Sequence, residues 1–275
     1  MPVLSIIACR MLEDELTHVL AGDSKLDHLI VVDSVDSQGL TRKLRALNRP
    51  FRVADLSKIP DLLYRDLRQR KRRLSYTPKT KRGTVDTIRR LIPRATDNLV
   101  VITHVLGLGL HVDSALLKKE VYAQIERLSC FSDRILVLYG ICDALRDVES
   151  DFSDDACALS FLIDGDKTRV VDCIALALGG NKSYQEILTN DNDIVLFLTP
   201  MWAAHWNDLR DDCKLLKHTR FKRVAKVDIG LSYEPNFDDD VQEFARKFTL
   251  KAVELPGSVD IMQRCYQQAK RGDVE

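Results

Sequence analysis

The stretch VLSIIAC at Val3–Cys9 indicates the fold class before any other segment does. Its apolar residues run on without the polar alternation of a half-exposed strand, which is typical of a strand buried on both faces. The next residues, Leu12–Leu20, place leucine and valine at helical spacing, and Gly22 ends that predicted helix. A second apolar run, HLIVVD at His28–Asp33, follows. This strand–helix–strand order predicts a parallel βαβ unit.

The same rhythm returns in the second half of the chain. Apolar runs there predict five more strands, at Arg134–Tyr139, Thr168–Asp172, Asp193–Leu198, Arg223–Gly230 and Leu250–Leu255. Helical spacing predicts helices at Lys182–Leu188, Val241–Phe248 and Val259–Ala269. We therefore expect an α/β, Rossmann-like fold, with one or two mostly parallel sheets and helices on both faces.

Residues 40–119 differ from the rest in composition. Arg65–Arg73 (RDLRQRKRR) is a dense basic run, and Asn98–His104 (NLVVITH) predicts the one strand of this region. We interpret 40–119 as a basic, mostly helical elaboration, and residues 1–39 with 120–275 as an α/β core that two Rossmann-like halves would fit. The basic run could contact RNA, but it contains no aromatic residue, so a solvated helix face is the favoured interpretation.

Composition narrows the class of protein. The chain has 275 residues, and Lys+Arg and Asp+Glu both number 41, so its net charge gives no general attraction to nucleic acid or to an anionic membrane. The start has no basic region before its apolar run, and no apolar segment approaches the roughly 20 residues that span a bilayer. We expect a cytoplasmic protein that contacts neither membrane nor nucleic acid. Its seven cysteines favour free thiols or a metal site over disulfides.

Three cysteines share a placement in the predicted fold. Cys9, Cys142 and Cys173 each stand at or just after the end of a predicted strand, in IIAC, LYGIC and VVDC. The carboxyl ends of parallel strands form one edge of a sheet, where open α/β folds bind their ligands. We therefore expect the three thiols to meet at that edge. We also expect the helix after each strand to lower the thiol pKa.

Three thiolates suit a soft metal. Zinc on three cysteines with a fourth position open is typical of catalytic sites, and a [4Fe–4S] cluster with one open iron is the alternative. The spacing includes no CxxC motif, so three unrelated buried thiols are the competing interpretation.

Two other segments could contribute to a pocket. Thr199–Trp202 (TPMW), with His205 and Trp206, could wall a flat ligand, although core packing explains the tryptophans at least as well. Gly179–Tyr184 (GGNKSY) could present backbone N–H groups to an anion, with Lys182 assisting. The alternative for that segment is a glycine helix cap.

A set of short motifs in a fixed order resembles a known family. They are Cys9 with Glu15 and Leu16, Tyr139–Cys142, Asp172–Ile174, Leu178–Gly180 with Tyr184, Thr199–Trp202 and Val227–Leu231. This order resembles an uncharacterised family, a domain of unknown function, common in methanogenic archaea and anaerobic bacteria. Its members often occur near corrinoid-dependent methyltransferases. The resemblance covers roughly Met1–Val35 and Ser132–Gln267.

The chain departs from the family pattern in two places. Val171 stands where the family usually has His before Asp-Cys, and Met201 stands where it tends to have Gly before Trp. The first departure removes a candidate fourth metal ligand. Either an open coordination position is therefore more natural here, or the site has decayed.

The resemblance implies a cysteine site. We assign Cys9, Cys142 and Cys173 as metal ligands, with zinc as the expected metal and a [4Fe–4S] cluster as the alternative. The other candidates are Asp172 and Trp202 as catalytic residues, and Gly140, Gly179, Gly180 and Tyr184 as cofactor-binding residues. Asp172 would orient a ligand, and Trp202 would wall the pocket.

The expected function is that of a metal-thiolate protein in one-carbon, corrinoid-linked metabolism. It would activate a small-molecule thiol for methyl transfer, as a metal-dependent transferase, beside a corrinoid or methyltransferase protein as partner. One alternative is a [4Fe–4S] Lewis-acid enzyme. The other is a non-enzymatic adaptor or chaperone for a corrinoid methyltransferase system, which docks through the basic region.

Overall fold

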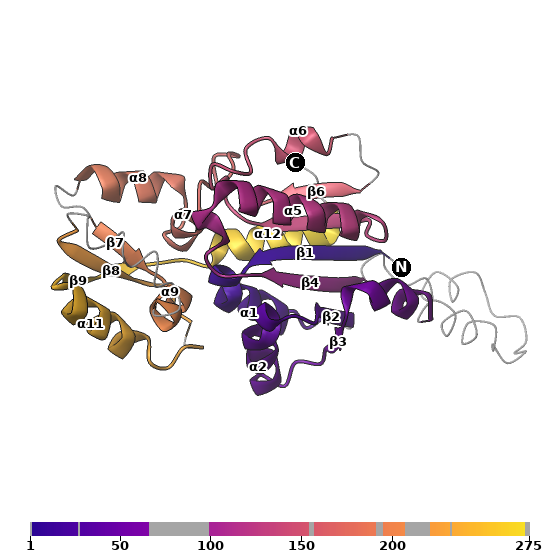
Figure 1. Ribbon diagram of the computed structural model, residues 1–275, viewed down its shortest axis with the longest axis horizontal. Coiled ribbons are helices and arrows are strands. Elements are labelled where there is room, and N and C mark those ends of the chain that lie inside the picture. The colour runs from indigo at the N-terminus through magenta and orange to yellow at the C-terminus, as the bar shows by residue number, and fades with distance from the viewer. Residues whose placement is uncertain are drawn as a thin grey trace, which may run out of the picture.

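A computed structural model of the chain has two lobes that lie side by side (Figure 1). It describes residues 2–26, 28–65, 99–153, 157–190, 195–206, 221–231 and 233–272. The large lobe comprises the described residues up to 178 and the C-terminal helix, and the small lobe comprises those from 181 to 256. The chain thus leaves the large lobe, builds the small one, and returns.

The large lobe is built on a six-stranded, all-parallel sheet in the order β3-β2-β4-β1-β5-β6. Its strands are β1 (Val3–Cys9), β2 (His28–Val32), β3 (Arg52–Ala54), β4 (Val100–Leu106), β5 (Arg134–Leu138) and β6 (Ala158–Phe161). Every residue of β1 is buried, because β1 has a strand on each side and helices over each face. The predicted α/β, Rossmann-like fold is confirmed.

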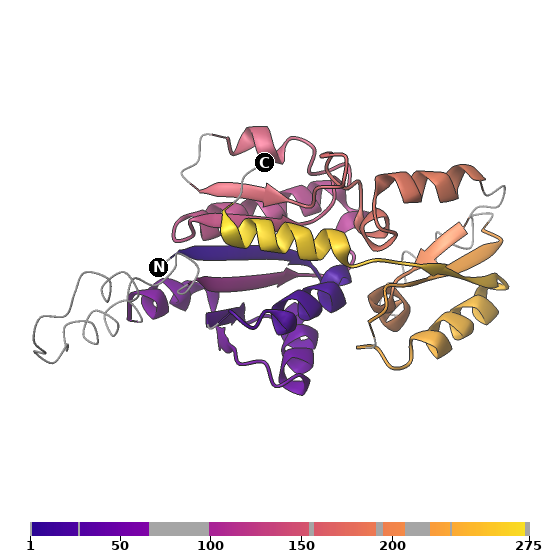
Figure 2. The same ribbon diagram turned by 180° about the vertical axis from the view of Figure 1, so that it is seen from behind.

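Helices cover both faces of this sheet. They are α1 (Glu13–Gly22), α2 (Gln38–Ala46), α5 (Ser114–Ser129), α6 (Val148–Asp151), α7 (Cys173–Ala177) and α12 (Asp260–Arg271). Short 3-10 helices lie at η1 (Arg10–Leu12), η2 (Val35–Ser37), η3 (Leu56–Lys58) and η4 (Leu110–Val112). Figures 1 and 2, seen from opposite sides, show α5 over one face and α12 over the other. Each buries an apolar stripe, which in α5 includes Leu117, Val121 and Ile125.

The small lobe has a three-stranded parallel sheet in the order β7-β8-β9. Its elements are α8 (Asn181–Asn190), β7 (Val195–Leu198), α9 (Pro200–His205), β8 (Arg223–Asp228), α11 (Phe237–Phe248) and β9 (Lys251–Pro256). Trp206 packs edge-on against Phe244 of α11, with ring centroids 5.3 Å apart. Tyr184 of α8 meets Phe197 of β7 at 5.7 Å. The small sheet therefore has its own aromatic core.

The described part of the range 40–119 belongs to the core of the large lobe. Strand β4 pairs with β1 along its whole length and with β2 on its other side, and α5 packs on the sheet. The expectation of a surface elaboration is therefore wrong for residues 40–65 and 99–119. The expectation came from the basic run Arg65–Arg73. Apart from Arg65, that run lies outside the described residues.

Three strand assignments also change. Thr168–Asp172 is extended but forms no ladder, and a single antiparallel bridge joins Arg169 to Ile163. Strands β3 and β6, of three and four residues, were not predicted. Both are short edge strands of the sheet, so neither produces a long apolar run in the sequence.

Within the described ranges, no helix combines the length and the apolar character needed to cross a bilayer.

Candidate functional site

A pocket of about 510 Å³ lies at the carboxyl edge of the large sheet and extends to the small lobe. Seven of the nine predicted site residues line it: Cys9, Cys142, Cys173, Asp172, Gly140, Tyr184 and Trp202. The cysteines, Asp172 and Gly140 come from the large lobe, whereas Tyr184 and Trp202 come from the small lobe. Open α/β sheets place ligands at this edge, and pockets between lobes are common binding sites.

Cys9 is the last residue of β1 and is 8% exposed. Burial raises the pKa of its thiol to about 11, and backbone hydrogen bonding at Met11 only partly offsets that effect. The buried hydroxyl of Tyr139 faces this thiol, but the two do not form a well-aligned hydrogen bond. Cys9 is therefore a protonated thiol at neutral pH unless a cation binds it.

Cys142 lies in a tight turn after β5. Its φ is +43° and that of Asp143 is +52°, so two consecutive non-glycine residues adopt the left-handed conformation. The turn is clamped to the segment before Cys173, because the N–H groups of Ile141 and Cys142 donate to the carbonyls of Val170 and Val171, both at 2.9 Å. The chain thus holds Cys142 and Cys173 as one unit.

Gly140 and Arg169 support the same unit. A Cβ on Gly140 would lie 2.5 Å from the Asp172 Cα, so no larger residue fits there without displacement. The Arg169 guanidinium donates to the Leu145 carbonyl at 2.7 Å. Gly140 therefore serves close backbone packing beside Cys142, which accounts for its place in the motif without a cofactor contact.

Cys173 is the first residue of α7, and Asp172 caps that helix. The Asp172 carboxylate accepts a hydrogen bond from the Ala175 N–H at 2.8 Å. Burial raises the pKa of Asp172, and hydrogen bonding at the start of α7 and the nearby Tyr184 hydroxyl only partly offset that effect. Tyr184 belongs to α8, so a side chain of the small lobe lies beside the cysteine-bearing helix.

The prediction that the helix starts lower the thiol pKa values is wrong. Burial raises the pKa of Cys142 to about 12, with further contributions from Cys9 and Asp172. Burial, then Cys9 and Asp172, raise the pKa of Cys173 well above its ordinary value. The cost of burying a charge exceeds the benefit of a short helix terminus. Since Cys9 raises the pKa of Cys142, and both raise that of Cys173, the three thiols lie close enough to interact.

The sulfurs are nevertheless not gathered as tightly as one zinc ion requires. Tetrahedral ligands at a Zn–S distance of about 2.3 Å lie roughly 3.8 Å apart. Among the residues that the structure describes, Glu13, Asp14 and Glu234 are the one trio whose ligand atoms all lie within 4.8 Å of one another. At least one pair of the three sulfurs is therefore farther apart than 4.8 Å.

Glu15 is a further buried group beside the cysteines. It is 2% exposed, its Oε1 has no hydrogen-bond partner, and its charge would raise the pKa of both Cys9 and Cys173. Burial raises the pKa of Glu15 to about 8. Backbone hydrogen bonding partly offsets that effect, and repulsion from Asp14 adds to it. Glu15 was part of the family motif but was given no role from the sequence. The signal that could have indicated one was an acidic residue at the start of a helix that is otherwise buried.

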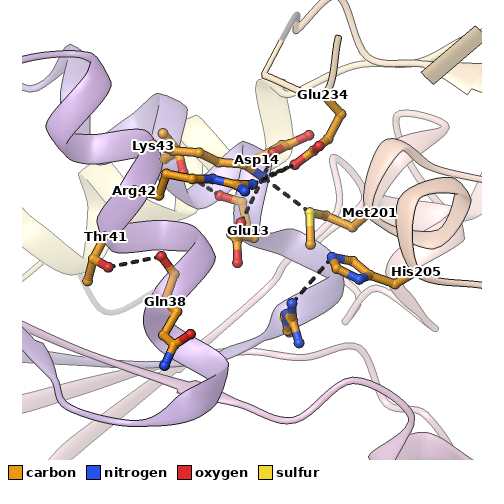
Figure 3. A network of polar contacts seen from close by, with 11 residues as sticks. Glu13, Asp14, Gln38, Thr41, Arg42, Lys43, Met201, His205 and Glu234 are labelled. Carbon is orange, nitrogen blue, oxygen red and sulfur yellow. Dashed lines mark hydrogen bonds and ion pairs between the residues drawn. The ribbon is translucent and has the colours of Figure 1, made fainter. Parts of the chain in front are cut away.

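A buried cluster of charges lies where the lobes meet (Figure 3). The Lys43 ammonium is 2.7 Å from Glu13, 2.5 Å from Asp14 and 2.6 Å from Glu234. Burial by itself would lower the pKa of Lys43, but the carboxylates of Asp14 and Glu13 raise it above its ordinary value. These residues come from distant parts of the chain, so no sequence pattern predicted the cluster.

Gly179 and Gly180 do not line the pocket. They connect α7 to α8 with φ values of +82° and +134°, and the Asn181 N–H that follows donates to the Asp164 carboxylate at 2.6 Å. Lys182 is largely exposed and pairs with Glu186. The segment therefore forms the connection between the lobes and presents no N–H groups to this pocket.

Trp202 and the other aromatic candidates differ in their surroundings. Trp202 lines the pocket and packs edge-on against Phe244, at 6.3 Å between centroids. Trp206 is 3% exposed in the small-lobe core, as core packing predicts. His205 lies 3.3 Å from the Arg10 guanidinium and does not line the pocket.

Comparisons with known proteins give a family but no function. No curated protein and no solved structure matches the chain. The family model described as "Protein of unknown function (DUF1638)" matches residues 105–266, more than half of the chain. That range includes Cys142 and Cys173 but not Cys9. The protein therefore belongs to the DUF1638 family, in line with the expected resemblance to a domain of unknown function.

Proposed function

We propose that this is a metal-thiolate protein, in which Cys9, Cys142 and Cys173 hold a soft metal centre beside a small-molecule pocket. One observation carries the proposal: three thiols from separate segments line a single pocket. Burial raises all three pKa values, and repulsion from Cys9 raises those of Cys142 and Cys173 further. Such thiols are poor nucleophiles by themselves at neutral pH. A bound cation would offset the repulsion and stabilise the thiolates.

The donor set fits a soft metal. Three cysteines would leave one coordination position open, which is the arrangement of catalytic zinc sites. His111 also lines the pocket and interacts with Asp172, so its imidazole is a further nitrogen donor beside that position. Zinc would supply a positive charge that lowers the pKa of a bound thiol or water. To hold it, the sulfurs must approach more closely than they do here, since they are not all within 4.8 Å of one another.

The surrounding residues position a ligand rather than react with it. Asp172 fixes the first turn of α7, on which Cys173 stands, through the Ala175 N–H. Tyr184, Phe197 and Trp202 provide an aromatic wall from the small lobe, which excludes water from the thiol side. We propose a small thiol as the ligand, activated for methyl transfer; the resemblance to a family found near corrinoid-dependent methyltransferases supports this narrower step.

Metal analysis of the purified protein tests the proposal. Anaerobically purified wild type should carry about one equivalent of zinc, or several of iron. Cys142→Ser and Cys173→Ser should lose most of it. Cys130→Ser is the matched control, because Cys130 is exposed and its thiol bonds to the Glu126 carbonyl, away from the pocket. Metal at less than about a tenth of an equivalent in wild type would refute a resident metal centre.

A [4Fe–4S] cluster is the second candidate, and the spacing of the sulfurs favours it. The cysteines of such a cluster bind different irons and lie farther apart than the ligands of one zinc ion, in line with a separation above 4.8 Å for at least one pair. A brown protein that dithionite bleaches would support the cluster. A colourless protein with bound zinc would support the first candidate.

A further inference from the structure

Two segments of the described chain connect the lobes, and both contain glycine. One runs through Gly179 and Gly180, with left-handed φ values. The other runs through Gly257 and Ser258, and the Ser258 N–H donates to the Ala177 carbonyl at 2.8 Å. A Cβ on Gly257 would lie 2.7 Å from that carbonyl. These two connecting segments, the glycine crossings, lie next to each other and form a narrow axis about which lobes can rotate.

Lys43 bonds to both lobes at another part of their interface. Its ammonium contacts Glu13 and Asp14 of the large lobe, and Glu234 of the small lobe at 2.6 Å. It also lies 3.2 Å from the Met201 sulfur. Figure 3 shows these side chains converging on the Lys43 ammonium. Lys43 is 5% exposed, so these contacts are shielded from water and only weakly screened by salt.

The Lys43 contacts act directly on the pocket wall. Met201 and Trp202 are neighbours in α9, so the contact with Met201 holds the helix that carries Trp202 against the large lobe. The large lobe contributes all three thiols, and the small lobe contributes the apolar side with Phe197 and Trp202. The angle between the lobes therefore sets the width of the pocket and the access to its thiols.

We propose that Lys43 is a positioning residue that holds the small lobe closed over the cysteine pocket, through Glu234 and Met201, with the glycine crossings as the hinge. This inference rests on the proposed function only in taking this pocket as the ligand site. Loss of the tie opens the lobes, exposes Trp202 and frees the thiols. A ligand that bridges the two sides would have the opposite effect.

Glu234→Gln tests the tie without leaving Lys43 unpaired, since Glu13 and Asp14 remain. The same change also weakens the longer pair between Glu234 and the exposed Arg42 at 3.9 Å, so it tests the Glu234 contacts of the large lobe together. The matched control is Glu254→Gln, because Glu254 pairs with Lys226 inside the small lobe, at 3.6 Å. Both are made in a Trp206→Phe background, so that Trp202 is the single fluorescent indole. Acrylamide quenching then reports the exposure of Trp202, and maleimide labelling of metal-free protein reports access to the pocket thiols.

The expected result is faster labelling of Cys142 and Cys173 in Glu234→Gln, by about tenfold, the change in an opening equilibrium when a hydrogen bond between two charged groups is weakened to one with a neutral amide. Quenching of Trp202 should rise as well. Exposed Cys130 is the internal reference, and buried Cys157 and Cys265 should stay unlabelled while the fold is intact. The control should match the background protein in every reading.

Unchanged labelling and quenching in Glu234→Gln would overturn the proposal. If Cys157 and Cys265 are labelled, the variant has unfolded, and Glu234→Asp replaces it, since the shorter side chain keeps the charge but reaches less far toward Lys43. A smaller change in the same direction is then expected, and no change overturns the proposal. All readings use metal-free protein, so they stand apart from the metal analysis that tests the proposed function.

Discussion

Gly140→Ala should destabilise the protein and dismantle the candidate site together. Gly140 begins the turn that carries Cys142, and its backbone packs directly on the Asp172 backbone. An added Cβ would lie 2.5 Å from the Asp172 Cα, 2.6 Å from its nitrogen and 2.7 Å from the Val171 carbonyl oxygen. All three are main-chain atoms, so no side-chain rotation relieves the contact.

The expected loss of stability follows from the contacts that are weakened when the Gly140 and Asp172 segments move apart. Moving the two segments apart weakens the bonds from Ile141 and Cys142 to the carbonyls of Val170 and Val171, both 2.9 Å long. Each such bond contributes about 1 kcal/mol net, and overpacking a closed site costs about 1–3 kcal/mol. We therefore expect a loss of about 3 kcal/mol in the free energy of unfolding. Because the same movement separates Cys142 from Cys173, bound metal should also be lost.

Urea denaturation of wild type and variant measures the stability change, and metal content measures the second effect. Gly165→Ala is the control, because a Cβ at Gly165 meets nothing within 4 Å, and its stability should change by less than about 0.5 kcal/mol. A Gly140→Ala protein as stable as the control, with full metal content, would show that the clamp between the two cysteine segments is not what holds the site together.

Three further predictions concern charge, capping and metal. Burial raises the pKa of Glu15 to about 8, so the stability that Glu15 contributes is full below the ordinary pKa of Glu and is lost as pH rises toward 8. Urea titrations should therefore show that Glu15→Gln loses about 3 kcal/mol less than wild type between pH 5 and pH 8. The same dependence of stability on pH in both proteins would contradict this. Asp172→Ala should lose about 1 kcal/mol because α7 loses its cap, whereas Asp172→Asn should keep most of it; calorimetry that finds the two equally stable would refute the capping role. Chelation should lower the unfolding temperature of metal-loaded protein, since metal at a hundredfold excess over its Kd adds about 2.7 kcal/mol, and a Cys173→Ser protein should show no such shift.

Part of the fold could be read from local patterns. The runs at Val3–Cys9, His28–Asp33 and Arg134–Tyr139 match β1, β2 and β5 closely, because a strand buried on both faces needs apolar residues at every position. Short edge strands such as β3, with two of three residues exposed, carry no such signal. The central place of β4 was missed because strand order depends on pairing between distant segments, which a local pattern does not record.

Part of the candidate site could be predicted as well. Strand-end placement and motif order selected Cys9, Cys142 and Cys173, and all three line one pocket. The role of the glycines could not be predicted, since Gly140 packs against a backbone more than 30 residues away in sequence. The direction of the thiol pKa shifts was also missed, because burial and neighbouring charge outweigh the local helix start.

The sequence by itself determined the α/β class, the buried strands and the three cysteines at strand ends, because these follow from the periodicity of neighbouring residues. Only the tertiary structure decided that β4 lies at the centre of the sheet, that a second lobe completes the pocket, and that Lys43 joins Glu13, Asp14 and Glu234 in one buried cluster. The physical reason is the range of the interactions: helix and strand preferences act between adjacent residues, whereas desolvation and ion pairing depend on side chains that meet only after the chain has folded.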